Sequence, residues 1–276
     1  EMLNRADIVP GDSVVVYYGD GKSVQDVTGL ETIEILRESG ARVVVITETI
    51  EQCHYVNSMG FGESIVGIFS LEKLGQENPL FKWFNGMPVL PDPMINANKF
   101  RDGIRQFTSK TYSPVARKVG EFFGNSKFKV DVVIERAHKD SLAVSSMLVK
   151  PLTGRVIYLG DMGGKRYSFY APQVSIQQRT VIMPSATIIG TNLCNVNELN
   201  ALNRMIDAGW VDFPEVYLAP WGQAPRLHQS IMDNNLSKTV QNAVKTVLNH
   251  ALPAKNISTV DELLLNWFNE SQQEDG

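Results

Sequence analysis

Two apolar runs near the start of the chain constrain its fold more than any other feature. Residues 13–18 read SVVVYY and residues 41–47 read ARVVVIT. Uninterrupted β-branched runs are typical of strands that are covered on both faces in a parallel sheet. Residues 30–38 lie between them, carry apolar side chains at helical spacing and are followed by a Ser-Gly pair that suits a helix C-terminus. This order predicts a strand, a helix and a parallel strand within about 35 residues.

The turn after the first run has the outline of a phosphate-binding glycine turn. In the dinucleotide-binding fingerprint, glycines at G-x-G-x-x-G spacing tighten the turn, admit the pyrophosphate and let the helix pack on the strand. Gly19 and Gly21 hold the first two places, but Val24 stands in the third. Gly29 serves as the third glycine only if the loop carries an insertion of several residues. The turn therefore binds phosphates in an unconventional way, or it does not bind them.

Strands and helices continue to alternate along the chain. We expect four further strands, at 63–69, 129–135, 155–161 and 185–193. We expect the further helices at 50–58, 100–123, 141–149, 197–208, 224–232, 237–248 and 259–269. Short connections between such elements predict an α/β fold: a Rossmann-like, doubly wound, parallel six-stranded sheet with extra C-terminal helices.

The predicted domain organisation has one large domain and a short tail. Residues 1–250 are expected to form a Rossmann-like nucleotide-binding-type domain, and 251–276 a C-terminal helix with an acidic tail. Residues 70–98, rich in proline and aromatic residues, are expected to be an irregular insertion. Such a segment is either functional, for example as a lid, or an aromatic cluster that caps the end of the sheet. We expect the helix that follows to be interrupted near Ser113-Pro114.

Composition excludes several classes of partner. The net charge of −4 gives no general attraction to nucleic acid or to an anionic membrane. No apolar run approaches the roughly 20 residues that span a bilayer. The N-terminus lacks the layout of a signal peptide, so the expected location is the cytoplasm. Cys53 and Cys194 are expected to be small buried apolar residues, and the four histidines lack metal-ligand spacing, so no metal is predicted.

Several stretches of the sequence resemble a known family. They are PGDSVVVYYG, NSMGF, NKFRDGIRQFT, the run from DVVIERAHKDS to YLGDMGG, and ATIIGTNLCNVNELNALNRMIDAG. Through them the chain resembles the nucleotide-binding half of the medium-chain dehydrogenase/reductases, and it is most similar to the crotonyl-CoA carboxylase/reductases. The resemblance implies an NAD(P)H-dependent enoyl-thioester reductase whose substrate is acyl-CoA or a carrier-bound acyl thioester. It also implies a homodimer joined through the edge strand near 185–193.

Departures from the family bear on activity. The chain begins about where the family's GroES-like catalytic lobe would end. The family's Glu-His pair after the fourth strand is Glu135-Arg136 here, and arginine cannot lose a proton to act as a base. A Lys-Arg pair that the family places near the nucleotide phosphate is Ala186-Thr187. We therefore expect a reductase half that is inactive alone. The alternative is a pseudoenzyme, a non-catalytic scaffold or dimerisation domain of a multidomain synthase.

One carboxylate bears on the choice of cofactor. Glu48 follows the second strand, where a carboxylate bonds the ribose hydroxyls of NAD but repels the 2′-phosphate of NADP. Glu48 therefore favours NADH, although the resembled family uses NADPH; the alternative is a solvated carboxylate at a strand end. Residues and resemblance together give this set of candidate cofactor-binding residues: Gly19, Gly21, Gly29, Thr47, Glu48, Gly160 and Asp161.

Overall fold

The computed structural model describes residues 2–19, 24, 26–81, 94–125, 129–135, 141–159, 185–191, 195–211, 216–220 and 245–249. The chain divides into two compact units, Glu1–Asp212 and Phe213–Gly276. The boundary between them lies earlier than the division near residue 250 expected from the sequence.

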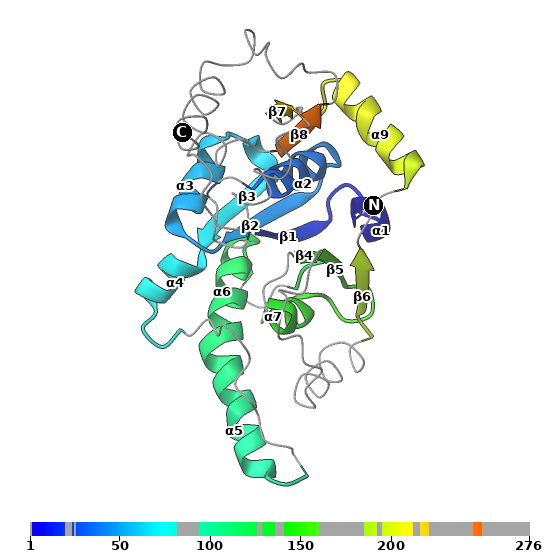
Figure 1. The fold of residues 1–276 in the computed structure, drawn as a ribbon. Coiled ribbons are helices and arrows are strands. Elements are labelled where there is room, and N and C mark those ends of the chain that lie inside the picture. The colour runs from blue at the N-terminus through cyan, green and yellow to red at the C-terminus, as the bar shows by residue number, and fades with distance from the viewer. Residues whose placement is uncertain are drawn as a thin grey trace, which may run out of the picture. The chain divides into compact units, whose positions relative to one another are not determined.

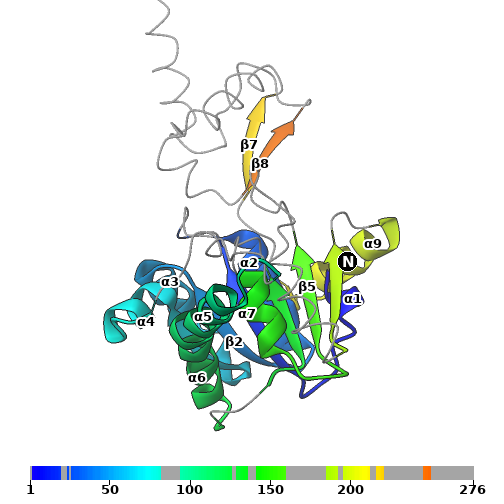
Figure 2. The same ribbon diagram turned by 90° about the horizontal axis from the view of Figure 1, so that it is seen from below.

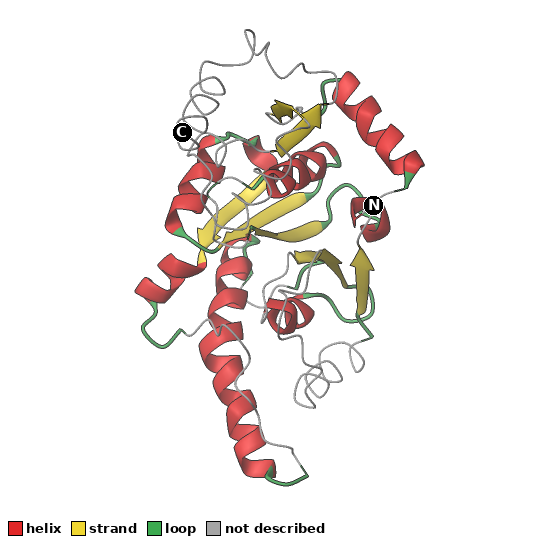
Figure 3. Ribbon diagram, in the orientation of Figure 1, coloured by secondary structure: helices red, strands yellow, loops and turns green. Residues whose placement is uncertain are grey.

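The first unit is built on a six-stranded parallel sheet, whose strands are yellow in Figure 3. The strands are β1 (Ser13–Tyr18), β2 (Arg42–Thr47), β3 (Ile65–Ser70), β4 (Val132–Glu135), β5 (Arg155–Leu159) and β6 (Thr187–Thr191). They lie in the order β3-β2-β1-β4-β5-β6, and every neighbouring pair is parallel. The predicted Rossmann-like sheet is therefore confirmed. Its strand order changes direction between β1 and β4, which is where open α/β sheets form their ligand crevice.

Helices cover both faces of this sheet (Figure 1). On one face, α1 (Met2–Ala6), α2 (Val27–Glu38) and α3 (Ile50–Ser58) contribute side chains to a buried apolar layer. The opposite layer is formed with α4 (Leu71–Glu77), α5 (Ala97–Phe107), α6 (Ser113–Phe122) and α7 (Ser141–Leu148). Because β1 alternates its side chains between the two layers, all six of its residues are buried, as its unbroken apolar sequence predicts. After β6, α9 (Val196–Asp207) ends the regular structure described in this unit.

The expectation of an irregular segment over 70–98 is partly wrong. Residues Leu71–Glu77 form α4, and α5 already begins at Ala97. The Ser70 side chain accepts a hydrogen bond from the Lys73 amide and so caps α4, while Leu71 and Leu74 bury their side chains in the sheet's apolar layer. Most of the prolines and aromatic residues that suggested the insertion belong to 82–93, outside the described residues.

The expected interruption near Ser113-Pro114 is present as a change of helix type. A π-helical turn, Thr108–Tyr112, connects α5 directly to α6, and the two helices follow one another as a long rod in Figure 1. Pro114 lies in the first turn of α6, where its missing N–H costs little. The regular α-helix is therefore interrupted just before Ser113-Pro114, and the π-helical turn joins its two pieces.

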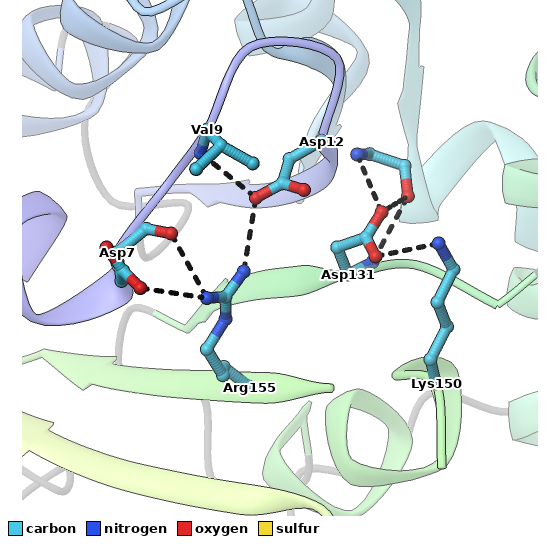
Figure 4. Close-up of polar contacts among 7 residues, drawn as sticks. Asp7, Val9, Asp12, Asp131, Lys150 and Arg155 are labelled. Atoms are coloured by element: carbon cyan, nitrogen blue, oxygen red, sulfur yellow. Dashed lines mark hydrogen bonds and ion pairs between the residues drawn. The ribbon is translucent and has the colours of Figure 1, made fainter. Parts of the chain in front are cut away.

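Charged side chains join the amino ends of β1, β4 and β5 (Figure 4). The guanidinium of Arg155 bonds the Asp12 carboxylate at 3.1 Å and the main-chain carbonyl of Asp7 at 3.1 Å. Lys150 Nζ lies 2.7 Å from Asp131 Oδ1. The other oxygen of Asp131 accepts bonds from the amide and the hydroxyl of Ser13 at 3.0 and 2.6 Å. These contacts hold together the amino ends of the strands, at the opposite end of the sheet from the carboxyl ends where α/β proteins bind ligands.

The second unit contains two described strands, β7 (Val216–Pro220) and β8 (Lys245–Asn249). They pair in parallel and lie side by side in Figure 2. The helix predicted over 237–248 is therefore wrong for its last residues, because 245–248 belong to β8. This end of the segment reads KTVL, and its β-branched residues suit a strand. The extra C-terminal helices predicted at 224–232 and 259–269 lie outside the described residues.

Candidate nucleotide-binding crevice

Three of the residues predicted from the sequence lie where β1, β2 and β4 end, at the edge of the sheet formed by the carboxyl ends of its strands. Gly19 follows β1, Glu48 follows β2, and Glu135 is the last residue of β4. Because β1 pairs in parallel with both β2 and β4, these ends are neighbours. The edge is the switch point at which α/β proteins bind ligands.

Gly19 and Gly29 each occupy a position where a side chain would crowd neighbouring atoms. Gly19 has a φ of +66°, and a Cβ atom on it would lie 3.1 Å from Nε2 of Gln52. A Cβ atom on Gly29, in the first turn of α2, would lie only 2.6 Å from a ring carbon of Tyr18. Gly29 therefore lets α2 approach β1 closely, which is the packing role of the third fingerprint glycine. Gly21 lies outside the described residues.

Tyr18 fastens the turn that these glycines border. Its side chain is fully buried, and its hydroxyl donates to the carbonyl of Val24 at 3.2 Å and accepts from the amide of Asp26 at 2.8 Å. A main-chain amide at the start of a helix is one of the groups that bind phosphate in this fold. In this chain a tyrosine hydroxyl takes that amide. Sequence reasoning missed this role, although a buried tyrosine at a strand end must find a partner for its hydroxyl.

Asp26 precedes α2, but its carboxylate does not cap the helix. The residue has an extended backbone, and its side chain makes no hydrogen bond to the amides of the first turn. Its Oδ2 atom instead faces both glycines, 3.3 Å from the Cβ position on Gly19 and 2.9 Å from that on Gly29. The Asp26 carboxylate therefore lies beside both glycines, next to the start of α2. Sequence reasoning missed Asp26 as well.

The tip of β2 is held by the first turn of α3. Gln52 is fully buried, and its Oε1 atom accepts from the amides of Glu48 and Thr49 at 3.1 and 3.3 Å. The Thr49 side chain accepts in turn from the Gln52 amide at 3.2 Å, which completes a capping box. Thr47, predicted as a cofactor contact, is buried, and its hydroxyl donates to the carbonyl of Thr49 at 3.0 Å. The T-x-x-Q spacing could have revealed Gln52 as the residue that positions Glu48.

Glu135 at the tip of β4 points into the protein rather than into the crevice. It is fully buried and accepts hydrogen bonds from the hydroxyls of Ser141 and Ser145 on α7, the second at 2.6 Å. Tyr17 of the neighbouring strand is buried beside this cluster. Burial raises the pKa of Tyr17 well above its ordinary value, and the negative charge of Glu135 adds to the rise. Glu135 therefore organises the interior beneath α7.

Other predicted site residues fall elsewhere. Ala186-Thr187 lies at the amino end of β6, where Thr187 pairs with Arg155, the first residue of β5. This end of the sheet is opposite the crevice, so the lack of charge at this pair does not bear on phosphate binding there. The remaining candidates, Arg136, Gly160 and Asp161, lie outside the described residues.

Cys53 is half-buried on α3, and burial raises the pKa of its thiol despite the nearby charge of Lys73. Cys194 lies outside the described residues. Within the described ranges, no group of three or more His, Cys, Asp or Glu side chains could hold a metal ion. No helix in those ranges has the length and apolar character needed to cross a membrane.

Comparison with known proteins finds solved structures with a similar fold. No family model and no curated protein match the sequence. The solved structure of crotonyl-CoA carboxylase/reductase AntE in complex with NADP is similar over 83% of this chain, with a TM-score of 0.60 and 18% identity. That of an NAD-dependent alcohol dehydrogenase is similar over 84%, with a TM-score of 0.50 and 14% identity. The chain has the fold of the nucleotide-binding half of medium-chain dehydrogenase/reductases.

The chain spans about half the length of the proteins that it matches, 48% of AntE and 51% of the alcohol dehydrogenase. A third structure extends the likeness along the chain. The 2-octenoyl-CoA carboxylase reductase CinF, in complex with NADP and 2-octenoyl-CoA, is similar over 95% of this chain and 48% of its own. Its TM-score is 0.54 at 17% identity. The resemblance predicted from the sequence is therefore confirmed for the fold.

Proposed function

We propose that this chain is the nucleotide-binding half of an enoyl-thioester reductase, and that this half does not transfer hydride by itself. The observation that carries the proposal is the switch point between β1 and β4 in the strand order, with Gly19 directly after β1 and Glu48 directly after β2. The acyl group would be bound as a CoA or carrier thioester, as the complex of CinF with 2-octenoyl-CoA suggests. The protein would contribute orientation and electrostatics to a reaction whose hydride comes from the nicotinamide.

The expected cofactor preference follows from Glu48. Its main-chain amide is fixed by Gln52, and its carbonyl accepts from the amide of Glu72 at 3.0 Å, so the turn that presents it is held on both sides. A carboxylate at this place bonds the two ribose hydroxyls of NADH and repels the additional phosphate of NADPH. NADH is therefore preferred, although AntE and CinF were solved with NADP.

A second candidate function is a scaffold or dimerisation domain without catalysis. The burial of Glu135 favours it, because the carboxylate at the family's Glu-His position does not face the crevice. Its neighbour Arg136 could hold an anion but could not serve as a base. In this reading the retained fold joins two copies through β6, which lies at an edge of the sheet.

Binding and turnover, measured separately, test the proposal. The chain is titrated with NADH and with NADPH by tryptophan fluorescence, and then incubated with crotonyl-CoA while reduced-nicotinamide absorbance is followed. We expect tighter binding of NADH than of NADPH and no turnover. Turnover by this chain alone would contradict the proposal. Binding of neither nucleotide at millimolar concentration would favour the scaffold.

A further inference from the structure

We propose that an exposed basic face of α5 and α6 docks an acidic protein, and that this partner is the carrier domain that presents the acyl thioester. The inference rests on the proposed function in one respect, because it chooses between the CoA and the carrier thioesters named there. It assigns a docking surface to a part of the chain that contains none of the candidate nucleotide-binding residues.

The spacing of four cations places them along one side of the rod formed by α5 and α6. Arg101 and Arg105 are four residues apart on α5, so they are neighbours on one helix face. Lys110 follows after five residues, and the π-helical turn Thr108–Tyr112 supplies the extra residue that keeps it in line. Arg117 on α6 follows after a further seven residues, which is close to two helical turns. These four residues form the basic stripe.

The basic stripe lies on the side of α5 that does not pack against the protein. Phe100 and Phe107 are buried and lie two turns apart, so they mark the packed side of the helix. Arg101 and Arg105 are exposed, and their positions lie on the other side. In Figure 1 the rod extends away from the sheet at its α5 end. A partner can therefore approach this face from solvent.

The charges of the basic stripe are not neutralised by ion pairs within the described part of the chain. None of the salt bridges there includes one of its four residues. The ion pair on α6 joins Lys118 to Glu121 at 3.2 Å and leaves Arg117 out. The one carboxylate on α5 is that of Asp102. The stripe therefore carries a net positive charge on a chain whose overall charge is −4.

Charge complementarity defines the partner as anionic, and the length of the stripe favours a protein. From Arg101 to Arg117 the stripe extends for roughly 24 Å along the helix axis. The phosphates of one nucleotide would contact only part of this length, whereas carboxylates repeated on a partner helix match it throughout. The overall negative charge opposes approach to nucleic acid or to an anionic membrane, whose charge extends over a much larger surface.

Apolar side chains at one end of the stripe also suit a protein partner. Met94 and Ile95, shortly before α5, have 93% and 84% of their surface exposed. Large apolar side chains beside a row of charges are typical of surfaces that bind an amphipathic helix. Neither residue would gain from contact with a small anion.

Of the two acyl donors in the proposed function, the carrier is the one that is a protein. A carrier-bound acyl group reaches an enzyme only after the carrier has docked on its surface. CoA diffuses freely and needs no such docking surface. The basic stripe therefore indicates a carrier-bound thioester whose carrier presents an acidic helix.

The test measures docking of an acidic acyl carrier protein in its apo form, which bears no acyl group, by fluorescence anisotropy of the labelled carrier. We expect Arg101→Gln and Arg105→Gln each to weaken binding by up to about fivefold, and the double variant by about tenfold. Asp102→Asn, which removes the opposing charge on the same helix, should tighten it. The matched control combines Arg37→Gln with Arg204→Gln, which removes two cations from α2 and α9 and should leave binding unchanged. Thermal unfolding checks that each variant remains folded.

Four outcomes would overturn the inference. They are no binding of the carrier by the wild-type chain, an equal loss in the control pair, displacement of the carrier by excess crotonyl-CoA, and binding to phosphatidylserine vesicles that the same substitutions abolish. The third would assign the basic stripe to nucleotide phosphates, and the fourth to a membrane. The measurement needs neither nicotinamide nor turnover. Failure to bind NADH and NADPH would therefore count against the proposed function and leave the carrier measurement intact.

Discussion

Among single residues, Tyr17 makes the stability of the fold depend on pH in the alkaline range. Its folded-state pKa lies well above the ordinary value of 10.0, because the hydroxyl is buried beside Glu135. The unfolded chain therefore loses the tyrosine proton first as the pH rises. The stability that depends on this proton is complete below about pH 10 and declines as the pH rises toward the folded-state value.

Tyr17→Phe should abolish this decline. At neutral pH we expect the variant to keep the wild-type stability to within about 1 kcal/mol, because phenylalanine fills nearly the same buried volume. Above about pH 10 the variant should become more stable relative to the wild type, since phenylalanine carries no proton to lose. Urea unfolding of both proteins across the alkaline range measures the effect. A constant difference between them at every pH would contradict the prediction.

Asp131 makes the stability of the fold depend on pH in the acidic range. Partial burial alone would raise its pKa, but the bonds from Lys150 and from the side chain and amide of Ser13 together lower it below its ordinary value of 3.8. A lowered folded-state pKa contributes stability above the ordinary value, and this stability is lost as the pH falls through the folded-state value.

Asp131→Asn should therefore cost about 1–3 kcal/mol at neutral pH, where the charged bonds are complete. The cost should diminish as the pH falls below 3.8, because the wild-type carboxylate is then protonated as well. Chemical denaturation at neutral and acidic pH measures both values. Asp207→Asn, at an exposed position on α9, is the control and should leave stability nearly unchanged.

At the scale of elements, replacing two glycines in edge strands by alanine should change stability by very different amounts. A Cβ atom on Gly67 of β3 would lie 2.2 Å from the ring of Phe122 on α6, whereas a Cβ atom on Gly190 of β6 would meet nothing within 4 Å. Gly67→Ala must displace a ring that also stacks with Phe69, so we expect a loss of about 1–3 kcal/mol. Gly190→Ala should change stability by less than about 0.5 kcal/mol. Thermal unfolding of the pair provides the measurement, and equal melting temperatures would contradict the argument.

Elements buried on both faces could be predicted from the sequence, and elements that depend on local capping could not. The β-branched runs of β1 and β2 identified those strands, because burial in a parallel sheet leaves no alternating pattern to misread. Helix α4 was missed, since the prolines that follow it suggested an irregular segment while Ser70 capped a short helix. Strand β8 was assigned to a helix, because its few residues offer little periodicity.

The candidate site was predictable only where a residue follows directly from its strand. Gly19 and Glu48 were found because they come immediately after recognisable strands. Tyr18 and Asp26 were not, because their hydrogen bond joins residues on either side of a turn whose path the sequence does not specify. The burial of Glu135 beneath α7 likewise depends on where that helix packs, which is a tertiary contact.

For the whole molecule, the open question is association through β6. The amide of Thr187 faces β5, where it donates to the carbonyl of Gly154, so the main-chain groups of Ile188 and Gly190 face the outer edge of the sheet. The carbonyl of Gly190 accepts a bond from the Arg5 side chain at 3.1 Å. A second copy that extended the sheet would have to displace this arginine.

We predict that the chain forms a homodimer through β6. A positive charge introduced on this edge strand should prevent the dimer from forming. Gly190→Lys introduces an ammonium group into open space, so the monomer should stay folded while two lysines oppose each other across the joined strands. Gly190→Ala is the matched control and should remain dimeric, and Arg5→Ala, which removes the competing donor, should bind its partner more tightly. Light scattering after size exclusion measures the mass of each. A monomeric wild type would refute the prediction, and a dimeric Gly190→Lys would place the contact on another surface.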